Sequence, residues 1–251
     1  MKLDNNLAGS TFEHFDIYPL SETAIIISFG TGIDVTIHNK VKAFTNHLDS
    51  KPIIGMVEYI PSFTSVTVFY DPIRVVQEGY KGRKLSAFET VSLKIKDLLK
   101  QLKEIDHTKQ REVEIPVCYG GELGPDLEYV TQYNNLTTDE VIHIHSGGEY
   151  LVYMIGFAPG FPYLGGMSEK IATPRKAKPR MAIPKGSVGI AGKQTGVYSI
   201  ETPGGWQLIG QTPFDLFLPS KTPPSLLQSG DIIRFKSISL KEYRDYKGDL
   251  R

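Results

Sequence analysis

The chain has 251 residues with 28 basic and 28 acidic side chains, so its formal net charge at neutral pH is zero. Non-specific nucleic-acid binding needs an excess of positive charge, and we therefore expect no nucleic-acid partner. The single cysteine, Cys118, excludes an intramolecular disulfide, and the polar N-terminus and short apolar runs give no sign of a signal segment or a membrane span. We expect a cytoplasmic protein without a membrane partner, long enough for two domains.

The first 118 residues alternate strand patterns with two amphipathic helix patterns. Residues 33–48 and 85–105 carry apolar side chains at three- and four-residue steps, which places them on one helix face. Runs rich in β-branched and aromatic residues indicate strands at 15–18, 24–29, 54–60, 65–70 and 112–118. With both helices on one face of an antiparallel sheet, this order predicts a ferredoxin-like, split βαβ domain over residues 1–118, with 112–118 as its last strand.

Residues 119–251 follow a different pattern, beginning with a glycine- and proline-rich break at 119–126 where we place the domain boundary. Helices are expected at 126–133 and from Thr137 to about His145, because Thr137-Thr-Asp-Glu140 matches a capping box. Strand patterns follow at 149–155, 181–183, 187–190, 197–201, 206–210 and 232–236. Short strands between glycine and proline turns predict an α+β chain whose second domain, residues 119–251, is a closed or nearly closed β-barrel.

Residues 156–166 read Gly-Phe-Ala-Pro-Gly-Phe-Pro-Tyr-Leu-Gly-Gly. Glycine permits positive φ and close approach of the backbone, whereas proline fixes φ and removes a hydrogen-bond donor, so this run is neither helix nor central strand. It predicts a rigid loop that directs Phe157, Phe161 and Tyr163 into a core or toward a pocket.

A basic, glycine-rich stretch follows the aromatic loop. Residues 171–200 contain no acidic side chain, although the chain as a whole is neutral. Lys185 and Lys193 stand beside glycines, and we expect them, with the amides of Gly189 to Gly192, to hold a small carboxylate or phosphate. The alternative is a solvated basic loop without a ligand. We assign three further basic residues to such a loop: Arg175, Lys176 and Lys178.

Two local motifs do not support a nucleotide or metal site. Gly192-Lys193 fails as a P-loop, because Ser187 stands where glycine is required and Gln194 where Ser or Thr is required. His143 and His145 lie two apart on a predicted helix and point in different directions, so they cannot bind one metal ion together. His145 is a candidate acid or base, or a hydrogen-bonded structural histidine.

Three segments carry a specific resemblance to a known family: 156–166, 183–192 and 201–210, the last reading Glu-Thr-Pro-Gly-Gly-Trp-Gln-Leu-Ile-Gly. The likeness extends upstream through 115–121 and 124–127. On these residues the chain resembles the family that contains the B subunit of 5-oxoprolinase and the sporulation-kinase inhibitor KipI. The resemblance implies an N-terminal α/β domain followed by a C-terminal cyclophilin-like β-barrel.

The same resemblance implies a subunit of an enzyme that uses ATP to hydrolyse 5-oxo-L-proline to L-glutamate, together with a homologous C subunit and an A subunit. ATP would serve the complex, with Mg as a candidate companion ion, and this chain would be inactive alone. The alternative is a KipI-like inhibitor that binds a sensor histidine kinase. A third possibility, carboxyl transfer, lacks a biotin-carrier motif in this sequence.

We expect a site shared with the partner subunit, where an apolar wall faces a small anionic substrate. The candidate catalytic residues are Lys185, Lys193 and His145. The predicted substrate-binding residues are Phe157, Pro159, Gly160, Phe161, Tyr163, Gly189, Gly192, Gln194, Thr195, Tyr198 and Trp206.

Overall fold

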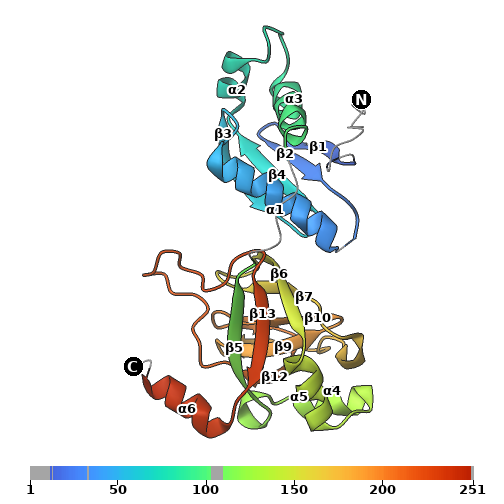
Figure 1. The fold of residues 1–251 in the computed structure, drawn as a ribbon, viewed down its shortest axis with the longest axis vertical. Coiled ribbons are helices and arrows are strands. Elements are labelled where there is room, and N and C mark those ends of the chain that lie inside the picture. Colours follow the sequence, from blue (N-terminus) through green and yellow to red (C-terminus); the bar gives the residue numbers. More distant parts are fainter. Residues whose placement is uncertain (1–11, 13, 33, 103–109, 250–251) are drawn as a thin grey trace. The chain divides into compact units, whose positions relative to one another are not determined.

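The computed structural model describes residues 12, 14–32, 34–102 and 110–249 (Figure 1). It consists of two compact units, Met1–Thr108 and Lys109–Arg251. Within the described ranges, every helix is too short or too polar to cross a membrane.

The first unit is an antiparallel sheet with strand order β1-β2-β4-β3 and helices packed on a shared apolar core. Its strands are β1 (Asp16–Ser21), β2 (Ala24–Ser28), β3 (Met56–Pro61) and β4 (Ser65–Tyr70), and its helices are α1 (Val35–Ser50), α2 (Pro72–Glu78) and α3 (Ala87–Leu99). Asp34 caps α1 by accepting from the amide of Thr36 at 2.7 Å, and Ser86 with Glu89 forms a capping box on α3. The predicted helix residues 33 and 103–105 lie outside the described residues.

The prediction that residues 112–118 form the last strand of the N-terminal domain is wrong. This segment is β5 (Glu112–Tyr119), which pairs in parallel with β13 (Ile232–Ser237) and antiparallel with β12 (Gln207–Gln211) in the second unit. In the first unit the position beside β2 is taken by β1, because the two strands form a hairpin. The sheet edge that a split βαβ domain reserves for its last strand is therefore filled from the N-terminal side, and the units divide at Thr108 rather than near residue 118.

The second unit is built on a sheet with strand order β10-β9-β12-β5-β13-β6-β7. Its remaining strands are β6 (Glu149–Ile155), β7 (Pro162–Gly165), β9 (Ser187–Ala191) and β10 (Gln194–Val197). The two ends of the sheet approach each other, since a Cβ added at Gly196 of β10 would lie 3.3 Å from the carbonyl oxygen of Pro162 in β7. The nearly closed barrel predicted from the sequence is therefore confirmed.

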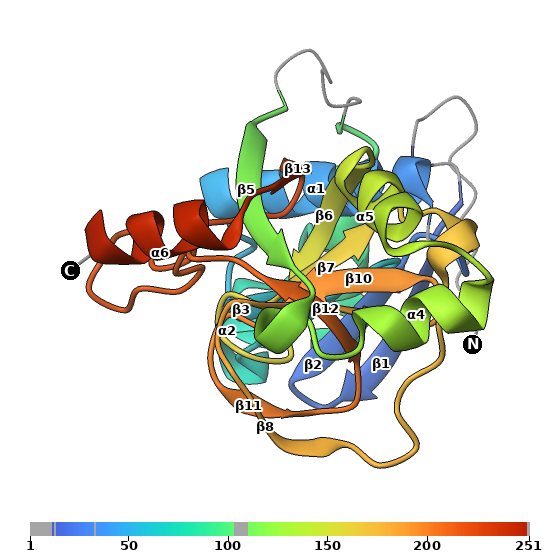
Figure 2. The same ribbon diagram turned by 90° about the horizontal axis from the view of Figure 1, so that it is seen from below.

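Helices and a short strand pair complete this unit. Figure 2 shows α4 (Leu127–Asn134) and α5 (Thr138–Ser146) against one side of the barrel, with the arm formed by β8 (Arg180–Ile183) and β11 (Thr202–Gly204) extending from it. The remaining elements are η2 (Gly121–Leu123), η3 (Glu169–Ile171) and α6 (Leu240–Asp249). The predicted capping box on α5 is confirmed. The amide of Thr137 donates to Glu140 Oε2, and the amide of Glu140 donates to Thr137 Oγ1.

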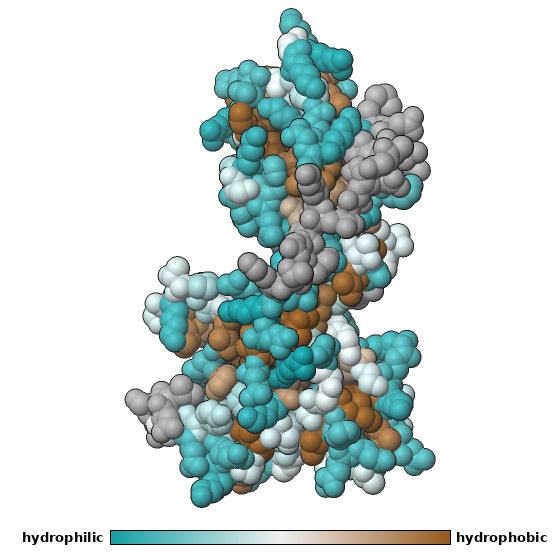
Figure 3. All heavy atoms as spheres, in the orientation of Figure 1, coloured by the Kyte–Doolittle hydropathy of each residue, from teal (hydrophilic) through white to brown (hydrophobic). Residues whose placement is uncertain are grey.

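Apolar side chains fill the barrel, and some also reach the molecular surface. The interior includes Ile115 and Val117 of β5, Val152 of β6, Val188 and Ile190 of β9, and Phe235 of β13. Figure 3 shows apolar patches between hydrophilic side chains on the visible face. Among the large exposed apolar residues, Phe157 in the second unit is 65% exposed.

Candidate functional site

An aromatic pocket of about 210 Å³ lies in the second unit. Its described lining consists of Phe157, Phe161, Tyr163, Arg175, Tyr198, Trp206 and the turn Pro203–Gly204–Gly205. Phe161 is the centre of the ring cluster, with its centroid 5.5 Å from Tyr198 and 5.7 Å from Trp206 in edge-to-face contacts. Burial raises the pKa of Tyr198, which keeps its hydroxyl neutral. The structure thus brings the five predicted aromatic residues together.

The predicted loop shapes one wall of this pocket, although its residues Pro162–Gly165 form strand β7 at the end of the sheet. The amide of Phe161 donates to the carbonyl oxygen of Ala158 at 3.0 Å, and Ser199 Oγ donates to the carbonyl oxygen of Pro159 at 2.6 Å. Gly160 has φ of +76°, and a Cβ added there would lie 2.8 Å from Phe217 Cβ, so a side chain would be strained and crowded. Pro159 and Gly160 therefore shape the loop and leave the direct contacts to the aromatic rings.

Phe157 is unusual within this loop. Its φ is +65°, a left-handed conformation that is a genuine outlier for a bulky residue, and its ring is mostly exposed. Its centroid lies 5.4 Å from that of Phe161. A strained backbone that holds an exposed aromatic ring at a pocket is typical of a binding position.

The glycines of the second predicted segment contribute space. A Cβ added at Gly189 would lie 3.1 Å from Trp206 Cβ, and one at Gly196 would lie 3.1 Å from Phe161 Cζ. β9 lies between β10 and β12, and the amide of Gly192 donates to the carbonyl oxygen of Thr173 at 2.7 Å. The amides of Gly189 to Gly192 are thus engaged within the protein. The missing side chain of Gly189 lets Trp206 pack directly on strand β9.

Asp126 anchors the segment that carries the cationic side of the pocket. This carboxylate is 5% exposed and accepts from Lys176 Nζ at 3.0 Å and from Arg180 Nη1 at 2.8 Å. It also accepts from the amide of Leu208 at 2.7 Å. Burial alone would raise the pKa of Asp126, but the hydrogen bonds from Arg180, Leu208 and Lys176 outweigh burial and lower it. Asp126 is therefore an ionised, buried anchor for residues 174–180.

Arg175 is the cation of the aromatic pocket. Its guanidinium carbon lies 6.0 Å from the centroid of the Trp206 ring. The backbone on either side is held, because Gln207 Nε2 donates to the carbonyl oxygen of Pro174 at 2.9 Å and the Lys176 amide donates to that of Gly205 at 2.7 Å. Within the described part of the chain, no carboxylate pairs with Arg175.

The sequence predicts a solvated loop for Arg175 and Lys176. Arg175 is indeed an exposed loop residue, although it also lines the aromatic pocket, whereas Lys176 is half-buried and pairs with Asp126. The sequence contains an indication of the ion pair of Lys176. Residues 171–200 carry cations but no acid, so a carboxylate that pairs with them has to come from another segment. Asp126 supplies such a partner from the break between the predicted domains. Lys178, like Arg175, is exposed as expected.

Lys185 and Lys193 do not join the aromatic pocket. Lys185 Nζ lies 3.0 Å from Asp215 Oδ1, and Lys193 Nζ lies 2.6 Å from Glu169 Oε1. The described residues that line the pocket include neither lysine, and Gln194 is also outside that lining. The geometry favours Arg175 as the cationic contact, and the roles of the two lysines stay predictions.

His145 is fully buried inside the barrel with both ring nitrogens occupied. Nδ1 lies 2.7 Å from the Tyr119 hydroxyl, and Nε2 lies 2.9 Å from Thr195 Oγ1. Because Thr195 donates its own proton to the carbonyl oxygen of Gly189, Nε2 carries the imidazole proton and Nδ1 accepts from Tyr119. Burial lowers the pKa of His145 to about 3. His145 and Thr195 therefore form a neutral interior network, and neither lines the aromatic pocket.

Metal ligation finds no support in the described residues, since no three His, Cys, Asp or Glu side chains there are grouped to hold an ion. Cys118 is buried, and burial raises the pKa of its thiol. The lining of the aromatic pocket, aromatic rings beside one guanidinium group, suits a small, partly apolar molecule.

Comparison with known proteins relates this chain to a family model and to named B subunits. Residues 15–227 match the family model described as the carboxyltransferase domain, subdomain C and D. The B subunit of 5-oxoprolinase from Bacillus subtilis (strain 168) is 52% identical over 93% of this chain and 97% of its own length. The B subunit of 5-oxoprolinase from Haemophilus influenzae (strain ATCC 51907 / DSM 11121 / KW20 / Rd) is 40% identical over 88% of this chain and 96% of its length.

A solved structure shows the same architecture within a longer polypeptide. The crystal structure of TTHA0988 is 32% identical, with a TM-score of 0.72. The match covers 86% of this chain and 40% of TTHA0988. More than half of that relative therefore lies beyond the region it shares with this chain.

Proposed function

We infer that this chain, which belongs to the carboxyltransferase domain family of subdomains C and D, is the B subunit of an ATP-dependent 5-oxoprolinase. The observation that carries this inference is the 52% identity to the B subunit of a 5-oxoprolinase, over nearly the full length of both proteins. A second B subunit, at 40% identity, supports it. The complex would hydrolyse 5-oxo-L-proline to L-glutamate.

The chemistry of the substrate explains the need for ATP. The lactam of 5-oxoproline is unstrained and a poor electrophile, so phosphorylation of its oxygen would create a leaving group before water attacks. Negative charge develops during both steps, and fixed donors must stabilise it. We assign substrate binding to this chain and ATP use, with Mg as its candidate companion, to the complex.

The aromatic pocket suits this substrate in size and polarity. At about 210 Å³ it is smaller than pockets for drug-sized ligands and matches a five-membered ring with one carboxylate. In this proposal the ring lies against Phe161 and Trp206, and the Arg175 guanidinium binds the carboxylate through charge-assisted hydrogen bonds. Phe157, Tyr163 and Tyr198 complete the apolar wall.

Partner subunits complete the site in this proposal. The exposed Phe157 ring at the pocket is one surface that a partner would cover. TTHA0988 supports the idea, because its unmatched part exceeds the matched part in length. We propose a homologous C subunit and an A subunit as partners, and we expect this chain to be inactive alone.

We further propose how the two units relate to known folds. The first unit, with strand order β1-β2-β4-β3 and helices on one core, is proposed to be a ferredoxin-like domain whose outer strand is β1. The nearly closed barrel of the second unit is proposed to be cyclophilin-like.

The direct test is reconstitution with the candidate A and C subunits from the same genome. We expect ATP-dependent release of glutamate from 5-oxo-L-proline only when all three chains are present. Arg175→Ala should lower kcat/KM by roughly 10- to 100-fold, mainly through KM, because a hydrogen bond to a charged group contributes about 1.5–3 kcal/mol.

Lys178→Ala is the matched control, since Lys178 is an exposed cation three residues from Arg175 that does not line the pocket. Its kcat/KM should stay within about twofold of the wild type. Glutamate release without this chain would refute the proposed function. Full activity of Arg175→Ala would refute only the assignment of the carboxylate to Arg175.

A further inference from the structure

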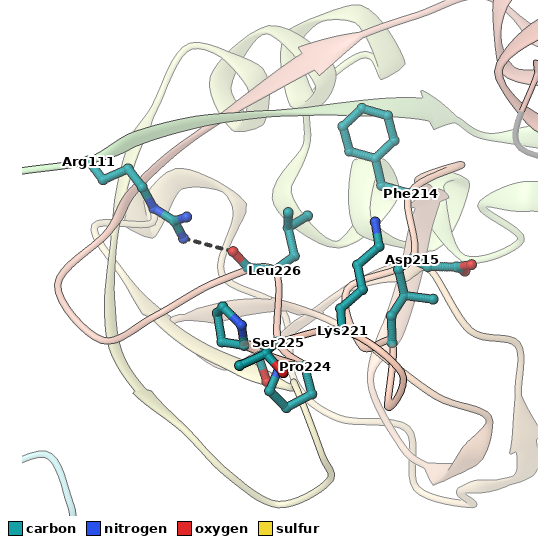
Figure 4. Close-up of a pocket in the computed structure, with 10 residues that line it drawn as sticks. Arg111, Phe214, Asp215, Lys221, Pro224, Ser225 and Leu226 are labelled. Carbon is teal, nitrogen blue, oxygen red and sulfur yellow. Dashed lines mark hydrogen bonds between the residues drawn. The ribbon is translucent and has the colours of Figure 1, made fainter.

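A second and larger pocket, of about 550 Å³, lies in the unit that holds the barrel. It is formed by the loop between β12 and β13 together with the start of β5, and its lining includes Arg111, Phe214, Leu218, Lys221, Pro224 and Leu226 (Figure 4). The described residues that line it are all different from those of the aromatic pocket. Its volume falls in the range typical of small-molecule sites.

Hydrogen bonds hold the loop that forms this pocket. The amide of Leu218 donates to the carbonyl oxygen of Pro224, and the amide of Leu226 donates to that of Leu216, both at 2.8 Å. At one end of the loop, Arg111 Nη2 donates to the carbonyl oxygen of Leu226 at 2.7 Å. The same guanidinium pairs with Asp231, whose side chain is 6% exposed. The pocket is therefore a preformed feature of the fold.

The polar groups of the pocket are mostly donors. Lys221 has no carboxylate within ion-pair distance among the described residues, and Arg111 Nη1 has no acceptor there. Asp215, the carboxylate in the lining, pairs with Lys185 at 3.0 Å. Figure 4 shows the Lys221 ammonium and the Arg111 guanidinium reaching the pocket on different sides of Leu226. This arrangement is suited to an anion.

The remaining walls are apolar. Leu218, Pro223, Pro224 and Leu226 line the pocket together with the ring of Phe214, which packs edge-to-face on Tyr246 at 5.7 Å between centroids. Flat apolar surfaces of this kind favour an aromatic or aliphatic body over a fully hydrated ion.

We propose that this pocket binds a small organic anion with a flat apolar body, whose carboxylate faces Lys221 while its body lies between Phe214 and Leu226. The proposal is independent of the 5-oxoprolinase assignment, because it uses a separate pocket.

The test compares two probes that differ in charge, 2-naphthoate and its neutral isostere 2-naphthamide, by titration of the ¹⁵N-labelled full chain. We expect 2-naphthoate to bind with a Kd of about 1 mM or tighter and to shift amide resonances within 214–226. The amide should bind about fivefold more weakly, as expected for loss of a solvent-accessible ion pair. Lys221→Gln should remove this preference for the carboxylate.

Arg175→Ala is the matched control, because the aromatic pocket also contains a cation and aromatic rings that could bind the probe. It should leave the affinity of 2-naphthoate unchanged within about twofold. The proposal is overturned by equal affinity for the two probes, by an unchanged preference in Lys221→Gln, or by absence of binding. Loss of binding in Arg175→Ala in place of Lys221→Gln would also overturn it.

Discussion

Two segments of the second unit, 174–180 and 185–193, carry basic but no acidic residues, and they differ in their partners. In the first, Lys176 and Arg180 bind Asp126, whose side chain is 7% exposed. In the second, Lys185 and Lys193 pair with carboxylates whose side chains are 35% and 73% exposed. The difference lies in the burial of the acid.

This comparison separates cations that shape the protein from cations that lie on its surface. A pair around a buried carboxylate must remain complete, because removing one partner leaves charge without compensation. An exposed pair is screened by water and contributes little. Asp126 therefore fixes the segment that carries Arg175 to the aromatic pocket.

The largest expected effect is that of Asp126→Asn. We expect the free energy of unfolding of the second unit to fall by about 3 kcal/mol, the lower end for a broken buried pair, because Lys176 and Arg180 are partly exposed. Urea unfolding followed by the fluorescence of Trp206, the only tryptophan, reports on this unit. Glu169→Gln is the control, with a change below about 0.5 kcal/mol. Equal effects of the two variants would contradict the comparison.

The second prediction concerns a buried group without a charged partner. The pKa of His145 is about 3 in the folded chain, below the value of 6.5 in the unfolded chain, so protonation favours unfolding. Stability should be fully present above pH 6.5 and should fall by up to about 1.4 kcal/mol per pH unit as the pH decreases from 6.5 toward 3.

The measurement is the free energy of unfolding from Trp206 fluorescence between pH 7 and pH 4.5. His145→Gln should reduce the slope, whereas the control His143→Gln, on the exposed side of α5, should retain it. A wild-type slope that persists in His145→Gln would assign the pH dependence to other groups.

The third prediction concerns Phe157, where relief of backbone strain should raise the free energy of unfolding. Replacing it with glycine relieves the left-handed strain, which is about 1–2 kcal/mol, and adds a glycine entropy cost of about 0.5–1 kcal/mol. We therefore expect Phe157→Gly to be more stable than Phe157→Ala by about 1 kcal/mol in urea unfolding. Both variants should raise KM for 5-oxo-L-proline, since both lose the ring. Unchanged KM would remove Phe157 from the site.

The smallest expected effects are those of Lys185→Ala and Lys193→Ala. Because their ion pairs are exposed, each substitution should change the free energy of unfolding by less than about 0.5 kcal/mol. Steady-state kinetics of the reconstituted complex then decides their role. Full activity would leave both as surface residues, whereas lost activity with unchanged stability would establish the predicted contact with substrate or intermediate.

The sequence by itself determined the local features of this protein. The glycine–proline pattern of residues 156–166 predicts the aromatic loop, although Pro162–Gly165 within it form strand β7. The Thr137–Glu140 box predicts the start of α5, and short strand patterns predict the barrel. Each of these features follows from backbone preferences over a few residues, so it can be predicted without knowledge of the fold.

Only the tertiary structure decided which distant segments meet. β5 has the same strand pattern in either unit, and its place depends on β1 already occupying the edge beside β2. Asp126 lies 50 residues from Lys176 and 54 from Arg180, so their ion pairs leave no local mark in the sequence. The cationic side of the aromatic pocket depends on such long-range pairing, because burial, which gives a charge pair its strength, is a property of the folded chain.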